Sequence, residues 1–242
     1  MSQPLEQIFE SKESLKKWVQ ENPLETLQAS AQDFSNFDFS GLSLIGVNFQ
    51  GCNLTGANFT GCSLYETNFR SATLDQSIFR NAILDRAILR SVECTAADFS
   101  ECEGTGVNAL SATFAQSKFV NSKFLRGDFE NAEFRDCNLS NVNFSHARLL
   151  QAKLSESVLN GANFSRAELA ESIWRNAKVN KDTNFALADW TERHDPARDG
   201  QEEIILSQKD DLLNWTKLRF IGSIPLFSGS SILLVGSLFF AL

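Results

Sequence analysis

The chain has 242 residues, with 30 acidic and 22 basic side chains, a formal net charge of -8 and a pI of about 4.9. This acidic balance disfavours non-specific binding to nucleic acids and other polyanions. The length allows one or two domains.

The first segment, residues 1–31, is predicted to be a short helical cap. Ser11 or Ser14 is a candidate helix N-cap, and Pro23 is expected to end the second helical piece. Charged residues run through the first 22 positions, so the segment does not resemble a secretory signal. Its apolar residues fall into two clusters at helical spacing: Leu5, Ile8 and Phe9, then Leu15, Trp18 and Val19.

Residues 32–192 have an apolar period of five. From Phe34 to Val179 every fifth residue is apolar or small, and 25 of these 30 centre positions are Phe or Leu. A period of five fits neither an ordinary helix nor a half-buried strand. Because a five-residue unit cannot bury its own apolar side chain, stacked neighbours are required, and the pattern predicts a solenoid.

The positions before each centre are also restricted. From Val47 onward the residue two before the centre is small, and the residue one before it is often Asn or Asp. With these features the chain resembles the pentapeptide-repeat family, whose motif is A(D/N)LXX. The motif appears directly in three stretches: Ala57-Asn58-Phe59, Ala97-Asp98-Phe99 and Ala162-Asn163-Phe164.

The resemblance implies an all-β solenoid, a right-handed quadrilateral β-helix with four repeats in each coil. Residues 20 apart should then stack, and about eight coils should give a rod of about 38 Å. After Val179 the register moves by one residue and continues through Phe185 and Trp190. The centres Gly104 and Ala109 are small, so we expect a distortion or outward excursion between about 100 and 111.

Few residues suggest chemistry. The five Cys occupy slots for small or apolar residues and form no CxxC pair, which favours packed, reduced thiols over a disulfide framework or zinc site. His146 and His194 fall at an outward position and in a linker. No catalytic, cofactor-binding or metal-binding residues are predicted, and the protein is expected not to be an enzyme.

Some outward positions carry apolar residues in place of polar ones. These residues could form a binding patch or be ordinary scattered surface residues. The surface interaction candidates are Ile78, Ile83, Ile88, Leu110, Leu125 and Leu150.

The C-terminal part has two predicted segments. Residues 193–218 form an acidic linker followed by an amphipathic stretch, and residues 219–242 form a predicted transmembrane helix. Lys217 and Arg219 lie just before the uncharged run from Phe220 to Leu242, and they predict that the rod lies on the cytoplasmic side. Within the predicted transmembrane helix a Gly-Ser pair recurs every seven positions, which places the pairs along one helix face and suits close packing of helices in lipid. The residues predicted to dock a membrane helix are Gly222, Ser223, Gly229, Ser230, Gly236 and Ser237.

These features favour a non-enzymatic, tail-anchored scaffold, assembly factor or accessory subunit. It would dock its rod on the cytoplasmic face of an integral membrane protein complex, without nucleic acid or small-molecule substrate. The abundance of the resembled family in cyanobacteria suggests a thylakoid photosynthetic complex. The alternative is a DNA mimic that binds a topoisomerase, as some members of that family do. That function needs columns of aligned carboxylates, whereas the charges here are interleaved.

Overall fold

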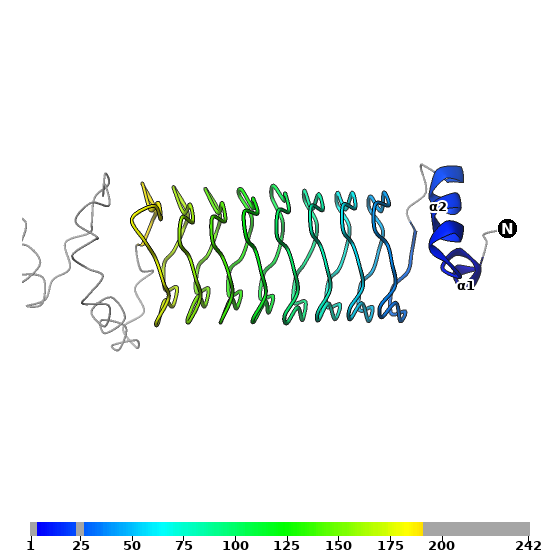
Figure 1. Cartoon of the computed structure of the whole chain (residues 1–242), viewed down its shortest axis with the longest axis horizontal. Coiled ribbons are helices and arrows are strands. Elements are labelled where there is room, and N and C mark those ends of the chain that lie inside the picture. The colour runs from blue at the N-terminus through cyan, green and yellow to red at the C-terminus, as the bar shows by residue number, and fades with distance from the viewer. Residues whose placement is uncertain (1–3, 23–26, 191–242) are drawn as a thin grey trace, which may run out of the picture.

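The computed structural model describes residues 4–22 and 27–190. Two helices, α1 (Leu5–Ile8) and α2 (Lys12–Glu21), precede a regular stack of coils that runs to residue 190. Figure 1 shows the coils side by side along one straight axis, with both helices at the N-terminal end. The predicted solenoid is therefore confirmed.

Parallel backbone pairing holds the coils together. The residue before each centre pairs with the residue 20 positions later, as in Asn48 with Asn68 and Asp98 with Lys118. Because the chain turns once in every five residues, a 20-residue coil has four sides. The fold is a right-handed β-helix of the quadrilateral kind. Its pairing begins at Gln28, slightly before the expected boundary at residue 32, and Leu27 and Ala29 are buried as its first inward residues.

Each side of the coil has its own column of inward centres, and the sides are numbered here in chain order. Side 1 contains Phe34, Leu54, Leu74, Cys94, Phe114, Phe134, Leu154 and Trp174. Side 2 contains Phe39, Phe59, Phe79, Phe99, Phe119, Leu139, Leu159 and Val179. Side 3 contains Leu44, Leu64, Leu84, Gly104, Phe124, Phe144, Phe164 and Phe185, and side 4 contains Ala29, Phe49, Phe69, Leu89, Ala109, Phe129, Leu149, Leu169 and Trp190.

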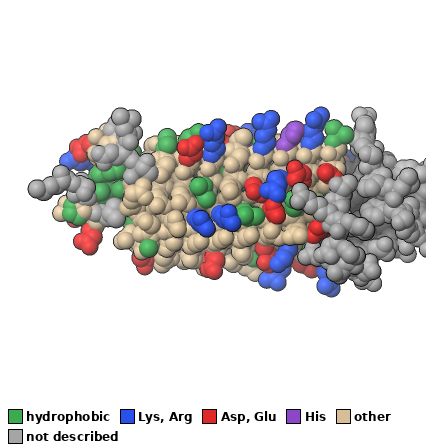
Figure 2. Space-filling model, turned by 180° about the vertical axis from the view of Figure 1, so that it is seen from behind, with side chains coloured by type: hydrophobic (Ala, Val, Ile, Leu, Met, Phe, Trp, Pro, Cys, Tyr) green, Lys and Arg blue, Asp and Glu red, His purple; other side chains and the backbone are tan. Residues whose placement is uncertain are grey.

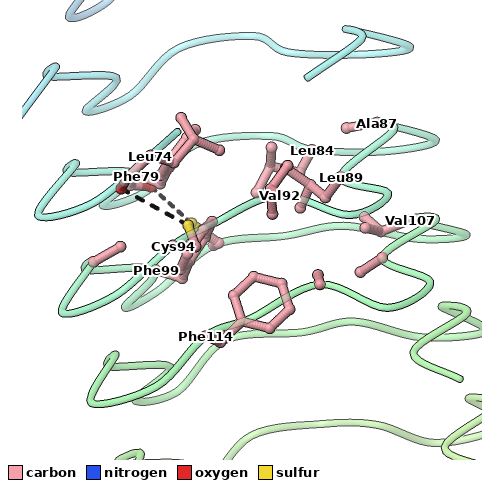
Figure 3. Packing of buried hydrophobic residues seen from close by; sticks show 14 of the residues in the cluster. Leu74, Phe79, Leu84, Ala87, Leu89, Val92, Cys94, Phe99, Val107 and Phe114 are labelled. Carbon is pink, nitrogen blue, oxygen red and sulfur yellow. Dashed lines mark hydrogen bonds between the residues drawn. The ribbon is translucent and has the colours of Figure 1, made fainter. Parts of the chain in front are cut away.

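The interior is filled by stacked rings. On side 2 the ring centroids of Phe59 and Phe79 lie 4.8 Å apart, and those of Phe79 and Phe99 lie 4.6 Å apart. These separations match the distance between neighbouring β-strands, so each coil adds one ring to the stack. Figure 3 shows the corresponding column of side 1, where Cys94 lies between Leu74 and Phe114 and no rings stack across these three residues.

Small polar residues two before a centre are also buried, and they find partners on the backbone. The Ser117 hydroxyl donates to the Cys94 carbonyl at 2.7 Å, and Thr67 donates to the Leu44 carbonyl at 2.8 Å. The thiol of Cys52 makes the equivalent contact with the Ala29 carbonyl at 2.9 Å. A donor in this slot therefore fits a dry interior without leaving its polar atom unpaired.

The corner position two after each centre adopts a left-handed backbone conformation. Glycines such as Gly61, with φ of +66°, suit it because they lack a Cβ. The same conformation recurs at Glu66 and Arg86, both with φ of +56°. The corner therefore accepts other residues, and stacking on the neighbouring coils maintains it.

The expected distortion between about 100 and 111 is wrong. Glu103 pairs regularly with Ile83 and Lys123, and the Gly104 N–H donates to the Lys123 carbonyl at 2.7 Å. The small centre is compensated by the next coil, because a Cβ at Gly104 would lie 2.9 Å from the ring of Phe124. A ring from the adjacent coil therefore fills the space.

The one-residue register shift after Val179 is confirmed. Asn163 pairs with Asn184 and Glu168 pairs with Asp189, a separation of 21 residues instead of 20. The additional residue is accommodated near Asn180, whose side-chain oxygen accepts from the Gly161 N–H at 2.9 Å.

The two helices lie against the first coil. The Ser11 side chain accepts from the Ser14 N–H at 3.1 Å, so Ser11 is the N-cap of α2. The ring centroids of Phe9 and Phe34 lie 4.3 Å apart, and Leu15 is fully buried. The Lys12 ammonium forms an ion pair with the Asp38 carboxylate at 2.9 Å. These contacts cover the apolar end of the solenoid.

The two predicted C-terminal segments, residues 193–218 and 219–242, lie outside the described residues. Within residues 4–22 and 27–190, the structure contains no helix that is both long enough and apolar enough to span a bilayer.

Candidate docking surfaces

The outward surface of each side is built from three columns. In every repeat the residues one before, one after and two after the centre point away from the interior, and each stacks on its equivalents 20 residues away. From residue 39 to residue 169 the other two residues of each repeat are buried, so contact with a partner along this part of the rod must use these columns.

The three isoleucines predicted as interaction candidates are exposed but do not share a side. Ile78, Ile83 and Ile88 are 37%, 46% and 36% exposed, and they lie on sides 2, 3 and 4 of a single coil. Residues five apart always fall on successive sides of the square. The three residues therefore form a girdle around the rod, and a flat partner cannot contact all of them together.

The three leucine candidates are half-buried and also divide between sides. Leu110 and Leu150 lie in one outward column of side 4, two coils apart, whereas Leu125 lies on side 3. The structure brings Leu110 near the column of Ile88 on side 4, and it separates both from Leu125.

A group on side 3 was missed from the sequence. The exposed Ile45, the half-buried Tyr65 and the exposed Ile83 occupy neighbouring coils of this side. The Arg86 guanidinium lies 5.8 Å from the centre of the Tyr65 ring and donates to its hydroxyl at 3.0 Å. The 20-residue spacing of Ile45 and Tyr65 was the available signal.

Charged residues in one column commonly alternate in sign from coil to coil. Lys123 pairs with Glu103 at 2.7 Å, and Arg86 pairs with Glu66 at 3.3 Å. Each exposed pair of this kind stabilises a fold by at most about 1 kcal/mol. The main consequence is that neighbouring charges in a column neutralise one another, so these columns carry no continuous row of like charge.

Side 4 also differs in charge along its length, although Asp128, Arg148 and Glu168 alternate in sign within one column. Toward the C-terminal end, Arg148 is surrounded by three carboxylates, those of Asp128, Glu130 and Glu168, and it forms ion pairs with all of them. Toward the N-terminal end, Arg70 and Arg90 are exposed, and neither makes an ion pair within the described part of the chain. In the central band of the face shown in Figure 2, two basic side chains lie nearer the N-terminal end than a mixed cluster of acidic and basic side chains.

The cysteines lie in the interior, and none forms a disulfide. Burial raises the pKa of the Cys62 thiol to about 11 and that of Cys137 to about 12. His146 lies at an exposed corner of side 3. Across residues 4–22 and 27–190, no group of three or more His, Cys, Asp or Glu side chains is placed to hold a metal ion.

The six residues predicted to dock a membrane helix lie outside the described residues. They are Gly222, Ser223, Gly229, Ser230, Gly236 and Ser237.

Comparison with protein-family models gave two matches. A model described as "Pentapeptide repeats (8 copies)" matches residues 29–61 and 67–103, and one described as "Pentapeptide repeat region" matches residues 127–194. Together they span more than half of the chain, so the protein belongs to the pentapeptide-repeat family. The search of curated proteins found no match.

Several solved structures are similar to this chain. QnrB1, a plasmid-mediated fluoroquinolone resistance protein, is 18% identical, with 71% of this chain and 85% of that chain covered and a TM-score of 0.48. HetL, a protein involved in heterocyst differentiation regulation from the cyanobacterium Nostoc sp. strain PCC 7120, is 20% identical, with 72% and 92% covered and a TM-score of 0.29. A protein from the Arabidopsis thaliana thylakoid lumen is 28% identical, with 52% and 68% covered and a TM-score of 0.20.

Proposed function

We propose that this protein is a non-enzymatic, tail-anchored scaffold, assembly factor or accessory subunit of an integral membrane protein complex. The observation that carries the proposal is the filled interior. Aromatic and aliphatic side chains fill the interior of successive coils, as in the stack of rings from Phe39 to Phe119. The small residues two before these centres are mostly buried as well. The rod therefore has its outer sides and its two ends with which to act.

The proposed attachment to a membrane is based on the sequence after residue 219. Phe220 to Leu242 is a run of 23 residues without a charge, and a helix of about 20 apolar residues spans a hydrocarbon core. Lys217 and Arg219 would hold the rod on the cytoplasmic side. In this proposal the helices at the N-terminal end prevent two rods from associating end to end there, because α2 blocks stacking of another coil on Phe34. In a cyanobacterium the partner would be a thylakoid photosynthetic complex.

The charge pattern supports a protein-docking scaffold over the DNA mimic. A mimic of duplex DNA must display continuous rows of negative charge, because DNA carries one charge in about every 1.7 Å of its axis. Here Glu103 is followed in its column by Lys123, and Glu133 is followed by Lys153, with ion pairs at 2.7 and 3.8 Å. Such columns offer a partner alternating charges instead of an acidic rod.

The test compares two substitutions in the tail. Gly229→Leu would block close packing of the Gly-Ser face against a partner helix, whereas Ser231→Leu places the same side chain about 200° around a helix. We expect Gly229→Leu to reduce recovery of membrane proteins with the tagged chain from gently solubilised membranes, and Ser231→Leu to leave it unchanged. Equal recovery with both variants would refute the docking face.

A further inference from the structure

We propose that side 4 is a self-complementary surface on which two copies of this chain pair antiparallel, side by side. The inference concerns the rod alone and does not depend on the membrane attachment. It starts from the distribution of charge along side 4, which differs between the two halves of the rod (Figure 2).

The N-terminal half of side 4 is basic. In its outward columns between residues 28 and 111, the charged residues are Arg70 and Arg90, one coil apart in the same column. The neighbouring outward residues are Asn, Gln, Ser, Gly or Ala, together with the apolar Ile88 and Leu110. No carboxylate in the described structure pairs with either guanidinium, so both have unused hydrogen-bonding capacity.

The C-terminal half of side 4 carries an excess of negative charge. The single guanidinium of Arg148 pairs with three carboxylates, those of Asp128, Glu130 and Glu168. The cluster of one positive and three negative groups therefore has a net negative charge. A second guanidinium brought to this cluster would therefore gain charge-assisted hydrogen bonds. The same chain thus contains both halves of a complementary pair.

The register of the columns determines how two copies would fit. Consider a twofold axis that lies in the interface, perpendicular to the rod and level with Leu110. It places each outward column opposite the same column of the second copy, which runs in the reverse direction. Leu110 then meets its copy, Arg90 faces Glu130 in the coil that also carries Asp128, and Arg70 faces Leu150. In the column before the centres, Asn68 faces Arg148 and Asn48 faces Glu168. No two like charges are opposed in this register.

A shift of the axis by one whole coil loses this property, whereas an axis midway between Leu110 and a neighbouring coil opposes no like charges but does not bring Arg90 to Glu130. An axis one coil nearer the N-terminus would oppose Arg90 with its copy, and an axis one coil nearer the C-terminus would oppose Glu130 with its copy. Like charges placed opposite one another suppress an association. Of the three axes that pass through these coils, the charge pattern therefore selects the one at Leu110, and this is the register that pairs Arg90 with Glu130.

The size of the surface suits a reversible dimer. A side about 35 Å long and about 15 Å wide gives roughly 1,000 Å² summed over both copies, at the low end for a specific interface. At its centre lies the half-buried Leu110, and the two adjacent coils carry Ile88 with Arg90 on one side and Asp128 with Glu130 on the other. An apolar centre with a polar rim is the usual composition of such interfaces.

The experiment measures self-association of the full-length chain in a neutral detergent by sedimentation velocity over a concentration series. The wild type should form a dimer. Arg90→Glu and Glu130→Arg should each weaken the dimer by at least about 10-fold, because each variant opposes like charges at two symmetric positions. Arg175→Glu makes the same charge change at an exposed position of side 1 and should leave the association unchanged. Circular dichroism confirms that each variant is folded.

Mixing the two weakened variants gives the decisive result. A chain with Arg90→Glu and a chain with Glu130→Arg restore opposite charges at both positions, so differently tagged variants should co-purify as a heterodimer although each pairs only weakly with itself. A wild type that stays monomeric at every concentration would overturn the proposal. It would also be overturned by a dimer that is indifferent to both substitutions, which would indicate pairing through the tail, or by failure of the mixture to restore pairing.

Discussion

Gly104 and Phe124 are stacked neighbours on side 3, and the ring of Phe124 lies where a side chain on Gly104 would be. A Cβ built at Gly104 would approach that ring to 2.9 Å and a methyl group of Val107 to 2.7 Å. Within the solenoid, the residue at one centre therefore determines which side chain the next coil can accept.

This relationship predicts a size exchange between coils. Gly104→Leu should destabilise the rod by about 1–3 kcal/mol, because the added atoms overlap Phe124 and force it from its position. Urea denaturation followed by circular dichroism measures the loss. Combining Gly104→Leu with Phe124→Ala should recover part of the stability. If the double variant is less stable than both single variants, the shared space is not real.

The contrast between inward and outward positions gives a second prediction. Phe79 is fully buried between Phe59 and Phe99, whereas the adjacent Ile78 is 37% exposed. Phe79→Asp should unfold the rod because it buries an unpaired charge. Ile78→Asp, the matched control, should change the unfolding free energy by less than about 1 kcal/mol. A folded Phe79→Asp protein would contradict the inward assignment.

The contact between α2 and the first coil predicts a pH-dependent contribution to stability. The side-chain hydrogen bond from Lys12 is the main cause that lowers the pKa of Asp38 to about 2. A carboxyl with a depressed folded-state pKa stabilises the fold above its unfolded pKa of about 4, and this contribution is lost as the pH falls toward 2.

Lys12→Met should therefore destabilise the protein at neutral pH but have a smaller effect near pH 2. Because both partners are partly exposed, the difference at neutral pH should be no more than about 1 kcal/mol. Urea denaturation of both proteins at the two pH values measures it. An equal difference at both would assign the effect of Lys12 to packing.

The cysteine thiols should be unreactive in the folded protein. Burial raises the pKa of Cys62 to about 11, and all five cysteines are buried, so little thiolate is available at neutral pH. A thiol reagent should label the native chain slowly and react with all five after unfolding in denaturant. Rapid stoichiometric labelling of the native chain would show that the interior opens to solvent.

Much of the fold follows from the sequence because the period of five determines the inward positions, the corners and the 20-residue stacking step. The shift after Val179 was visible for the same reason. The regular coil at Gly104 was not predicted, since a small centre appears as a defect until Phe124 is placed beside it. The start at Leu27 was missed because the centre Ala29 is not a Phe or Leu.

The surface was harder to predict than the interior. Ile78, Ile83 and Ile88 are neighbours in the repeat pattern, yet each lies on a different side of the square. The segregation of Arg90 and Glu130 to different halves of side 4 becomes apparent only when residues are grouped by side and counted along the axis. Outward columns must therefore be assigned to sides before any patch is inferred.

The most direct test of the proposed function is recovery of partners from membranes. The tagged full-length chain and a chain lacking residues 219–242 are purified from gently solubilised membranes of the native host, and bound proteins are identified by mass spectrometry. We predict that subunits of an integral membrane complex accompany the full-length chain and are lost on truncation. Retention of the same partners by the truncated chain, or recovery of a topoisomerase by both, would contradict the proposal.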